Sequence, residues 1–181
     1  RERQPAQALL RNYRKDGRPF WNELHLAPVQ DDRGETTHFI GVLQDITERM
    51  RLQAALQAQE ALFRSVFDHA GVGIAISDSE ACIWHINPAL TRILGYAHEE
   101  VLGRSFLEFT LPEDRAESRA RLAHLHAGEA ERISMEKRYL RKDGNVVWAL
   151  VEATMVRGQE GTPDFLVATI SDLNEVKAAE E

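Results

Sequence analysis

The residues best able to carry chemistry in this sequence are its histidines and its single cysteine, and none has a spacing that supports catalysis. His98 precedes two glutamates, as in the helices of zinc proteases, but Leu102 stands where the second histidine ligand is needed. His124 and His126 are two residues apart, so on a helix they point in different directions and cannot chelate one metal. Cys82 lies in an apolar stretch without a nearby base, which is typical of a small packed side chain. We therefore expect no catalytic residue, no metal site and no enzymatic activity in this chain.

Composition is typical of an acidic globular protein. The 181 residues carry a formal net charge of −7, a balance that argues against nucleic acid as a partner. Hydrophobic residues make up 43% of the chain, which is enough for a sizeable core. A single cysteine forms no intrachain disulfide and suits a reducing compartment. Because no apolar run approaches the roughly 20 residues that cross a bilayer, we expect a cytoplasmic chain that does not insert into a membrane.

The sequence contains an internal repeat. Residues 11–48 return at 138–175 with a constant offset and without a gap. Both copies contain the tetrapeptide RKDG, and Trp21 corresponds to Trp148. The residues before the second copy have no counterpart before the first. We therefore expect the end of one domain, a connector, and one complete domain of the same kind.

Each copy of the repeat is expected to fold as three antiparallel strands. An Asp-Gly pair between alternating apolar and polar residues is the strongest short-range signal for a hairpin. A second turn with a glycine follows, at 31–34 in the first copy and at 158–161 in the second. The expected strands are 7–14, 19–29, 37–45, 132–141, 146–156 and 165–171. Strands joined in this way form an antiparallel meander.

A helix is expected directly after each meander, with Thr47 and Asn174 as the N-cap residues. The first of these helices is predicted over 48–69. It carries an apolar seam with three- and four-residue spacing, formed by Leu52, Leu56, Leu62, Phe63, Val66 and Phe67. This thin seam favours packing against the same helix of a second copy, hence a homodimer, or packing on the neighbouring domain. The two interpretations do not exclude each other.

The segment between the two copies adds short strands and short helices. The expected elements are strands at 72–76 and 82–86, and helices at 88–95, 97–103 and 112–128. Asn87 and Pro88 are typical of the N-cap and the first residue of a helix. Together with the second meander this gives five antiparallel strands with helices on one face. The fold class is therefore α+β.

Several groups of residues, taken together and in order, resemble a PAS domain followed by its PAC motif. They are INPA at 86–89, LGY at 94–96, EEVLG at 99–103, RKDG at 141–144 and DL at 172–173. The resemblance covers about 60–175. It implies a PAS fold, in which a five-stranded antiparallel sheet and short helices surround a small apolar pocket. It also implies a sensory or dimerising input module of a signalling protein.

The first copy resembles the last strands of a LOV domain, the flavin-binding branch of the PAS family, across the residues NYRKDGRPFWNELHLAP at 12–28. The resemblance implies that Asn12 and Asn22 hydrogen-bond the isoalloxazine ring in an intact domain, with Leu24 on the same face as Asn22. An amide suits this role because it both donates and accepts. Leu43 replaces the family's glutamine beside flavin N5, and the adduct-forming cysteine falls before this chain. FMN is compatible with the intact first domain, and no cofactor is expected in this chain.

The second domain departs from the LOV pattern. Its residues at the corresponding positions are Tyr139, Ala149 and Ile170, and Phe106 stands where the family has its cysteine. A haem-binding PAS domain would need an axial histidine near Ser118, where this chain has none. We therefore expect neither flavin nor haem in the second domain.

Strand parity predicts which residues face the pocket of the second domain. They are Ile86, Leu94, Phe106, Ala149, Val151 and Ile170, together with Ala153, Ala168 and either Ile74 or Ile76. This lining holds almost no polar group to orient a ligand, so a filled core and a small apolar ligand are both open. Trp148 and Leu150 have the opposite parity. We expect the connector helix or a partner subunit to cover this outer face.

These features predict a signal-transduction module. Its parts are 1–46, the end of a LOV-like domain; 47–69, a connector helix; 70–173, a complete PAS domain; and 174–181, the start of a second signalling helix. A change in the pocket would shift the strand that ends at Asp45 or Asp172, and with it the helix that starts at Thr47 or Asn174. By family analogy, a covalently linked output domain such as a histidine kinase or diguanylate cyclase follows. The alternative is a cofactor-binding sensor.

Overall fold

The computed structural model of this chain describes residues 6–158 and 164–180. The chain divides into two compact units, 1–62 and 63–181. Strands and helices both contribute, and the strands of each unit are antiparallel, so the α+β class is confirmed. Among the described residues, no helix is long and apolar enough to cross a membrane.

The first unit contains a three-stranded antiparallel sheet in the order β1-β2-β3. Its strands are β1 (Ala6–Tyr13), β2 (Pro19–Gln30) and β3 (Thr36–Asp45). The first hairpin turns at Gly17, whose φ of +81° suits a residue without a side chain. The second turn closes with a hydrogen bond from the Gly34 N–H to the Asp31 carbonyl (2.9 Å). The meander predicted from the Asp-Gly pair is therefore confirmed.

Helix α1 (Thr47–His69) follows the first meander. None of its residues is buried. Its expected apolar seam is present and largely exposed: Leu52, Leu56, Leu62, Phe63 and Val66 are 57–66% exposed. Only Phe67 is partly covered, and its ring stacks on that of Phe63.

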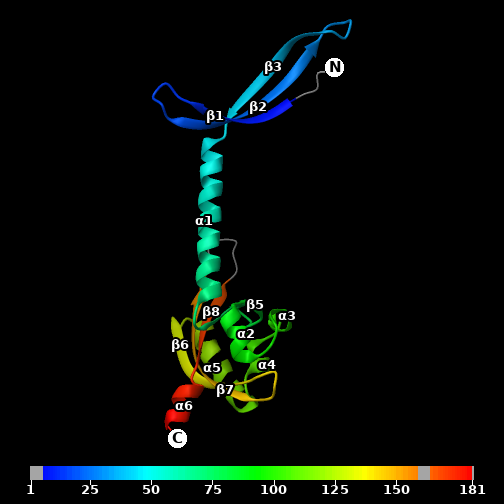
Figure 1. Ribbon diagram of the computed structural model, residues 1–181. Coiled ribbons are helices and arrows are strands. Elements are labelled where there is room, and N and C mark those ends of the chain that lie inside the picture. The colour runs from blue at the N-terminus through cyan, green and yellow to red at the C-terminus, as the bar shows by residue number, and fades with distance from the viewer. Residues whose placement is uncertain (1–5, 159–163, 181) are drawn as a thin grey trace. The chain divides into compact units, whose positions relative to one another are not determined.

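The second unit is built on a five-stranded antiparallel sheet in the order β5-β4-β8-β7-β6. Its strands are β4 (Gly73–Asp78), β5 (Ile83–Ile86), β6 (Arg132–Leu140), β7 (Val146–Val156) and β8 (Phe165–Asp172). Figure 1 shows the short helices gathered beside this sheet. The second hairpin of this meander, expected at 158–161, falls largely outside the described residues.

The helices of the second unit are α2 (Pro88–Leu94), α3 (His98–Val101), α4 (Phe106–Phe109), α5 (Arg115–His126) and α6 (Asn174–Glu180), with a 3-10 turn η1 (Pro112–Asp114) before α5. Asn87 caps α2 and Pro88 is its first residue, as predicted. The helix ends at Gly95, whose φ of +75° is left-handed. Helix α4 was not predicted, because a single turn is too short to show a helical period.

The core of the second unit lies between the sheet and helices α2 to α5. β7 alternates as predicted: Val147, Ala149, Val151 and Ala153 are buried, and Trp148 and Leu150 on the opposite face are half-buried. Leu90, Leu94 and Phe109 pack against the buried set from the helices. This arrangement leaves a cavity beside the sheet.

Candidate functional site

The space beside the sheet is a cavity of about 60 Å³. Four of the six residues predicted to face a pocket do line it: Leu94, Phe106, Val151 and Ile170. Ala153 and Ala168 line it as well. Most of the lining is apolar, as strand parity indicated. A cavity of this size holds a few waters or a small organic molecule.

Three predicted lining positions are wrong. Ile86 and Ala149 are buried in the core but pack against other side chains and do not reach the cavity. On β4 the parity is the reverse of the prediction, since Ala75 and Ser77 face the cavity in place of Ile74 or Ile76. The reason is the close approach of α2. A Cβ on Gly73 would lie 2.9 Å from Leu90 Cδ1, so this face of β4 admits only small side chains.

Strand β6 supplies lining residues that the sequence reasoning missed. Ile133, Met135, Lys137 and Tyr139 alternate along β6 and all face the cavity. The expectation that the lining holds almost no polar group is therefore wrong, because Lys137 is among them. A signal was available: a lysine at the inward parity of an otherwise apolar strand face does not fit a solvated position.

Lys137 is buried, with 2% of its surface exposed. Its Nζ lies 3.3 Å from Thr110 Oγ1, and 4.3 Å and 4.6 Å from the ring centroids of Phe106 and Tyr139. Burial lowers the pKa of this ammonium from 10.5 to about 7, and the negative charge of Asp114 opposes the change. Burial also raises the pKa of the Tyr139 phenol. The cavity thus combines apolar walls with a single amine.

Asp114 does not pair with Lys137, because Arg138 occupies both of its oxygens. Arg138 donates from its backbone N–H (2.8 Å) and Nε (3.0 Å) to Oδ2, and from its second guanidinium nitrogen to Oδ1 (2.6 Å). The hydrogen bond with the Arg138 side chain lowers the pKa of the Asp114 carboxyl. The Asp114–Arg138 pair fixes η1 to β6, and it leaves the Lys137 charge without a paired carboxylate.

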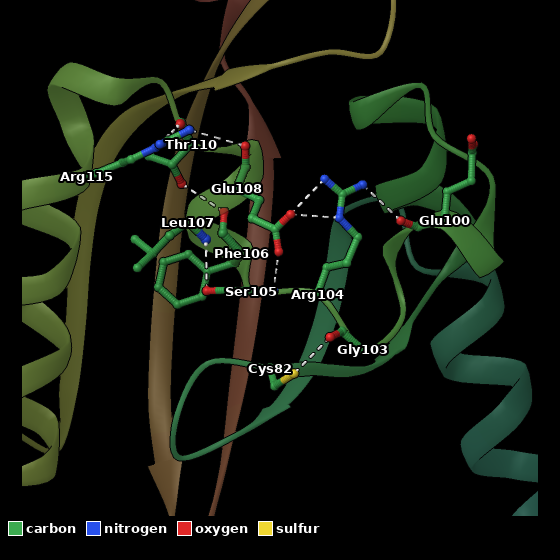
Figure 2. A network of polar contacts seen from close by, with 10 residues as sticks. All are labelled: Cys82, Glu100, Gly103, Arg104, Ser105, Phe106, Leu107, Glu108, Thr110 and Arg115. Carbon is green, nitrogen blue, oxygen red and sulfur yellow. Dashed lines mark hydrogen bonds and ion pairs between the residues drawn. The ribbon is translucent and has the colours of Figure 1, made fainter.

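A polar network positions the cavity wall at α4 (Figure 2). Ser105 and Glu108 form a capping box at the start of α4. Arg104 donates from Nε to Glu108 Oε2 (3.0 Å) and from its guanidinium to the Glu100 carbonyl (3.2 Å). At the end of α4, Thr110 Oγ1 donates to the Phe106 carbonyl (3.0 Å). These contacts hold Phe106 and Thr110 beside the Lys137 ammonium.

A second arrangement recurs in both copies of the repeat, where the last strand of the meander passes into a helix. The Trp21 N–H donates to Thr47 Oγ1 (2.8 Å), and the Trp148 N–H donates to Asn174 Oδ1 (3.0 Å). We call each of these a strand–helix joint. The tryptophan carbonyl in turn accepts the N–H of the residue before the helix, at 2.8 Å in both copies.

The predicted capping role of Thr47 and Asn174 is replaced by this contact. Both residues are the first of their helices. Their backbone N–H groups donate to the residue two positions earlier, Asp45 Oδ1 (3.0 Å) or Asp172 Oδ1 (2.8 Å). Hydrogen bonds from the side chain and the backbone N–H of Thr47 lower the pKa of the Asp45 carboxyl. The side chain of Thr47 or Asn174 therefore joins the start of the helix to the middle strand of the meander. The side chain of Asp45 or Asp172 joins it to the last strand.

Two protein families match this sequence, and together they cover most of its length. Residues 61–173 match a family described as the PAS fold, and residues 1–48 match one described as a PAS domain. The chain belongs to the PAS family. The predicted resemblance is thus confirmed in both parts, with a partial PAS domain first and a complete one after it.

Relatives of this PAS chain are signalling proteins. It is 37% identical over 126 residues to the Escherichia coli protein named "Probable diguanylate cyclase DgcE", which covers 70% of this chain and 11% of that protein. A blue-light-activated histidine kinase of Brucella anthropi is 27% identical over 190 residues, covering 98% of this chain and 38% of the kinase. The PAS domain of an HTR-like protein from Haloarcula marismortui superposes with a TM-score of 0.58 at 28% identity, over 68% of this chain and 98% of that one.

The chain spans only a small part of the length of these curated relatives. It is a PAS sensory segment homologous to sensor regions of histidine kinases and diguanylate cyclases. The cavity with its buried Lys137 and the strand–helix joint are the candidates for the function of this PAS segment.

The first PAS unit places the predicted flavin residues on one sheet face. Asn12 pairs with Phe20, Asn22 with Asp45, and Leu24 with Leu43, and these pairs share one parity. Asn22 is 6% exposed, whereas Leu43 is 60% exposed. Gln44, the glutamine next to Leu43 in the sequence, has the opposite parity. FMN binding by an intact first domain stays a prediction.

Side chains of α6 and β6 cover part of the outer face of the second PAS sheet, where the connector helix or a partner subunit was expected. Lys177 of α6 and Arg138 of β6 lie over the Trp148 ring, 5.5 Å and 5.3 Å from its centroid. Lys177 also pairs with Glu136 (2.9 Å). The helix that follows the domain therefore contributes to this cover, and it does so directly beside the second joint.

The remaining candidates for chemistry have structural surroundings. Cys82 is half-buried, against the expectation of a fully packed side chain, and its thiol donates to the Gly103 carbonyl (3.0 Å; Figure 2). His124 contacts Glu129 at the end of α5. Ser118 is buried on α5 beside the cavity and donates to the Asp114 carbonyl (2.9 Å). Within the described ranges, no group of three or more His, Cys, Asp or Glu is arranged to hold a metal ion.

Proposed function

We propose that this chain is a non-enzymatic relay. The second PAS domain senses a change in its cavity and transmits this change through its strand–helix joint to α6. The joint of the first unit transmits a movement of its own sheet to α1 in the same way. The observation that supports this most directly is the recurrence of the joint. Thr47 and Asn174 differ in side chain, yet each accepts the N–H of the tryptophan at the equivalent position of its own copy, Trp21 or Trp148.

The contacts of the second unit give the relay a physical route. β6 carries Lys137 and Tyr139 on the cavity face and Arg138 on the other. Arg138 contacts the Trp148 ring, and Trp148 bonds the first residue of α6. A displacement of β6 against β7 therefore acts on the joint without a separate connecting element. Interfaces of this kind have discrete packings and transmit small shifts.

The output lies outside this chain in this proposal. The relatives include a histidine kinase and a protein named as a diguanylate cyclase, and the chain aligns with only part of each. We propose that a covalently linked domain of one of these kinds receives the movement of α6. A fusion to either output domain would show which one responds when the cavity is altered.

Replacing Asn174 by alanine is expected to loosen the second joint. The substitution removes the acceptor of the Trp148 N–H, and a lost hydrogen bond of this kind costs about 1 kcal/mol. Amide exchange at Trp148 should then become roughly fivefold faster. Asn174→Asp keeps an oxygen in place and serves as the matched control. Equal exchange rates in all three proteins would contradict the proposed joint.

We propose that α1 joins two copies of the chain through its apolar seam, because the seam residues are exposed within one chain. Leu56→Glu places a charge in this seam and is expected to weaken dimerisation about tenfold. Gln57→Glu adds the same charge to a neighbouring exposed position, so it controls for net charge. Sedimentation equilibrium measures both. A strict monomer at high concentration in the unaltered chain would overturn the dimer.

A further inference from the structure

Lys137 is a buried cation without an anionic partner. Within the described part of the chain it takes part in no ion pair, and Asp114, whose negative charge acts on it, is engaged by Arg138. Its one hydrogen bond, to Thr110 Oγ1, is long at 3.3 Å. An ammonium has three donors, so this contact leaves two of them without a partner of comparable strength. Burial of a charge in this condition is costly.

The cavity offers space for an anionic group that would pair with Lys137. Nζ lies at a wall formed by the Phe106 and Tyr139 rings, and both Lys137 and these rings line the cavity. Most of the remaining lining is apolar, and Ser77 and Ser118 add two hydroxyl groups to it. A single positive charge in a mostly apolar lining fits an amphipathic ligand with a single anionic group.

We propose that this cavity binds a small monocarboxylate, with the carboxylate on Lys137 Nζ and a short hydrocarbon chain between the apolar walls. Such a ligand would be the signal that the second PAS domain senses, so this proposal rests on the proposed function. The cavity volume limits the chain to about two to four carbons. A dicarboxylate or a phosphate would bring a second charge for which this lining has no cation.

Binding is tested with the full chain, using propionate and butyrate against their neutral amides, propionamide and butyramide. Titration calorimetry, or the amide shifts of β6, measures the affinities. The carboxylates should bind at least about tenfold more tightly than the amides, because a hydrogen bond to a charged group is worth about 1.5–3 kcal/mol. This comparison uses the unaltered protein, so it does not depend on the folding of a variant.

Lys137→Met removes the cation and keeps a side chain of similar length, so it should abolish the preference for carboxylates. Lys142→Met is the matched control, since Lys142 is an exposed lysine that pairs with Glu100 (2.5 Å) outside the cavity. It should bind propionate and butyrate as the unaltered chain does. Unchanged carboxylate affinity in Lys137→Met would overturn the proposal.

The affinity should also depend on pH. The ionisable groups that face Lys137 are Asp114 from η1, which is paired with Arg138, and Tyr139 from β6. Neither changes charge between pH 6 and 8.5. Since the pKa of Lys137 is about 7, the charged fraction and with it the carboxylate affinity should fall roughly thirtyfold over this range. An affinity that is flat with pH would contradict the assigned anchor.

The experiment separates this inference from the relay. If neither propionate nor butyrate binds, the carboxylate assignment is wrong, while the Asn174 exchange test still decides the joint. If they bind at Lys137 but saturation leaves the amide exchange of Trp148 and α6 unchanged, the ligand class stands and the sensory relay is wrong.

Discussion

Lys137→Met is expected to raise the free energy of unfolding of the second PAS domain at pH 7 by about 2–3 kcal/mol. The unligated cavity surrounds the amine with apolar groups, so its charged form is far less stable here than in the unfolded chain. Methionine fills a similar volume without that cost. Urea unfolding, followed through the amides of β6 and β7, measures the change.

The pH dependence of this effect has a definite sign. The folded pKa of about 7 lies below the value of 10.5 for a free lysine. Between pH 7 and 10.5 the unfolded chain therefore binds more protons than the folded chain. The free energy of unfolding rises with pH across this window. Below pH 7 the cost is present in full, and above pH 10.5 it vanishes. The variant should lack this rise, so its advantage should shrink steadily from pH 7 to 10.

Lys142→Met controls for the loss of one lysine. Its ammonium is exposed and paired, so the substitution should change the free energy of unfolding by less than about 1 kcal/mol. If Lys137→Met were as neutral as Lys142→Met at pH 7, or destabilising, Lys137 would not be a desolvated cation. The assigned carboxylate anchor would then lose its physical basis.

Asn87→Ala is expected to destabilise the second domain by about 3–4 kcal/mol. Asn87 is fully buried. Its Oδ1 accepts the N–H groups of Ile74 (2.8 Å) and Leu90 (3.0 Å), and its Nδ2 donates to the carbonyls of Phe67 (3.0 Å) and Val72 (2.9 Å). Alanine leaves these backbone groups, which are buried or half-buried, without these hydrogen bonds. Asn87 thus joins the end of α1, β4 and α2 at one point.

Two further variants sharpen this prediction. Asn87→Ser keeps an N-cap oxygen for α2 but cannot reach the two carbonyls, so it should recover about 1 kcal/mol relative to alanine. Asn145→Ala changes an exposed turn residue and should cost less than about 1 kcal/mol. Thermal or urea unfolding compares all three. A cost for Asn87→Ala as small as that for Asn145→Ala would rule out the four-bond arrangement.

The sequence by itself determined the elements whose cause is local. The Asp-Gly pairs with alternating neighbours predicted both meanders to within a residue or two, because turn chemistry and strand period act over a few residues. Asn87 and Pro88 predicted the start of α2 for the same reason. The repeat itself predicted that the two copies share one architecture, and the two joints show it.

Only the tertiary structure decided that the small face of β4 and the amine of Lys137 meet in the cavity. The small face of β4 turns inward because α2 approaches at Gly73, a contact that no property of β4 alone encodes. Lysine is a residue type that usually lies at the surface. Lys137 instead faces the cavity, because the edge strand β6 packs against α4 and η1. Burial and charge pairing depend on neighbours distant in sequence. For that reason the elements and most of the lining residues could be predicted from the sequence, whereas the missing ion-pair partner of Lys137 could not.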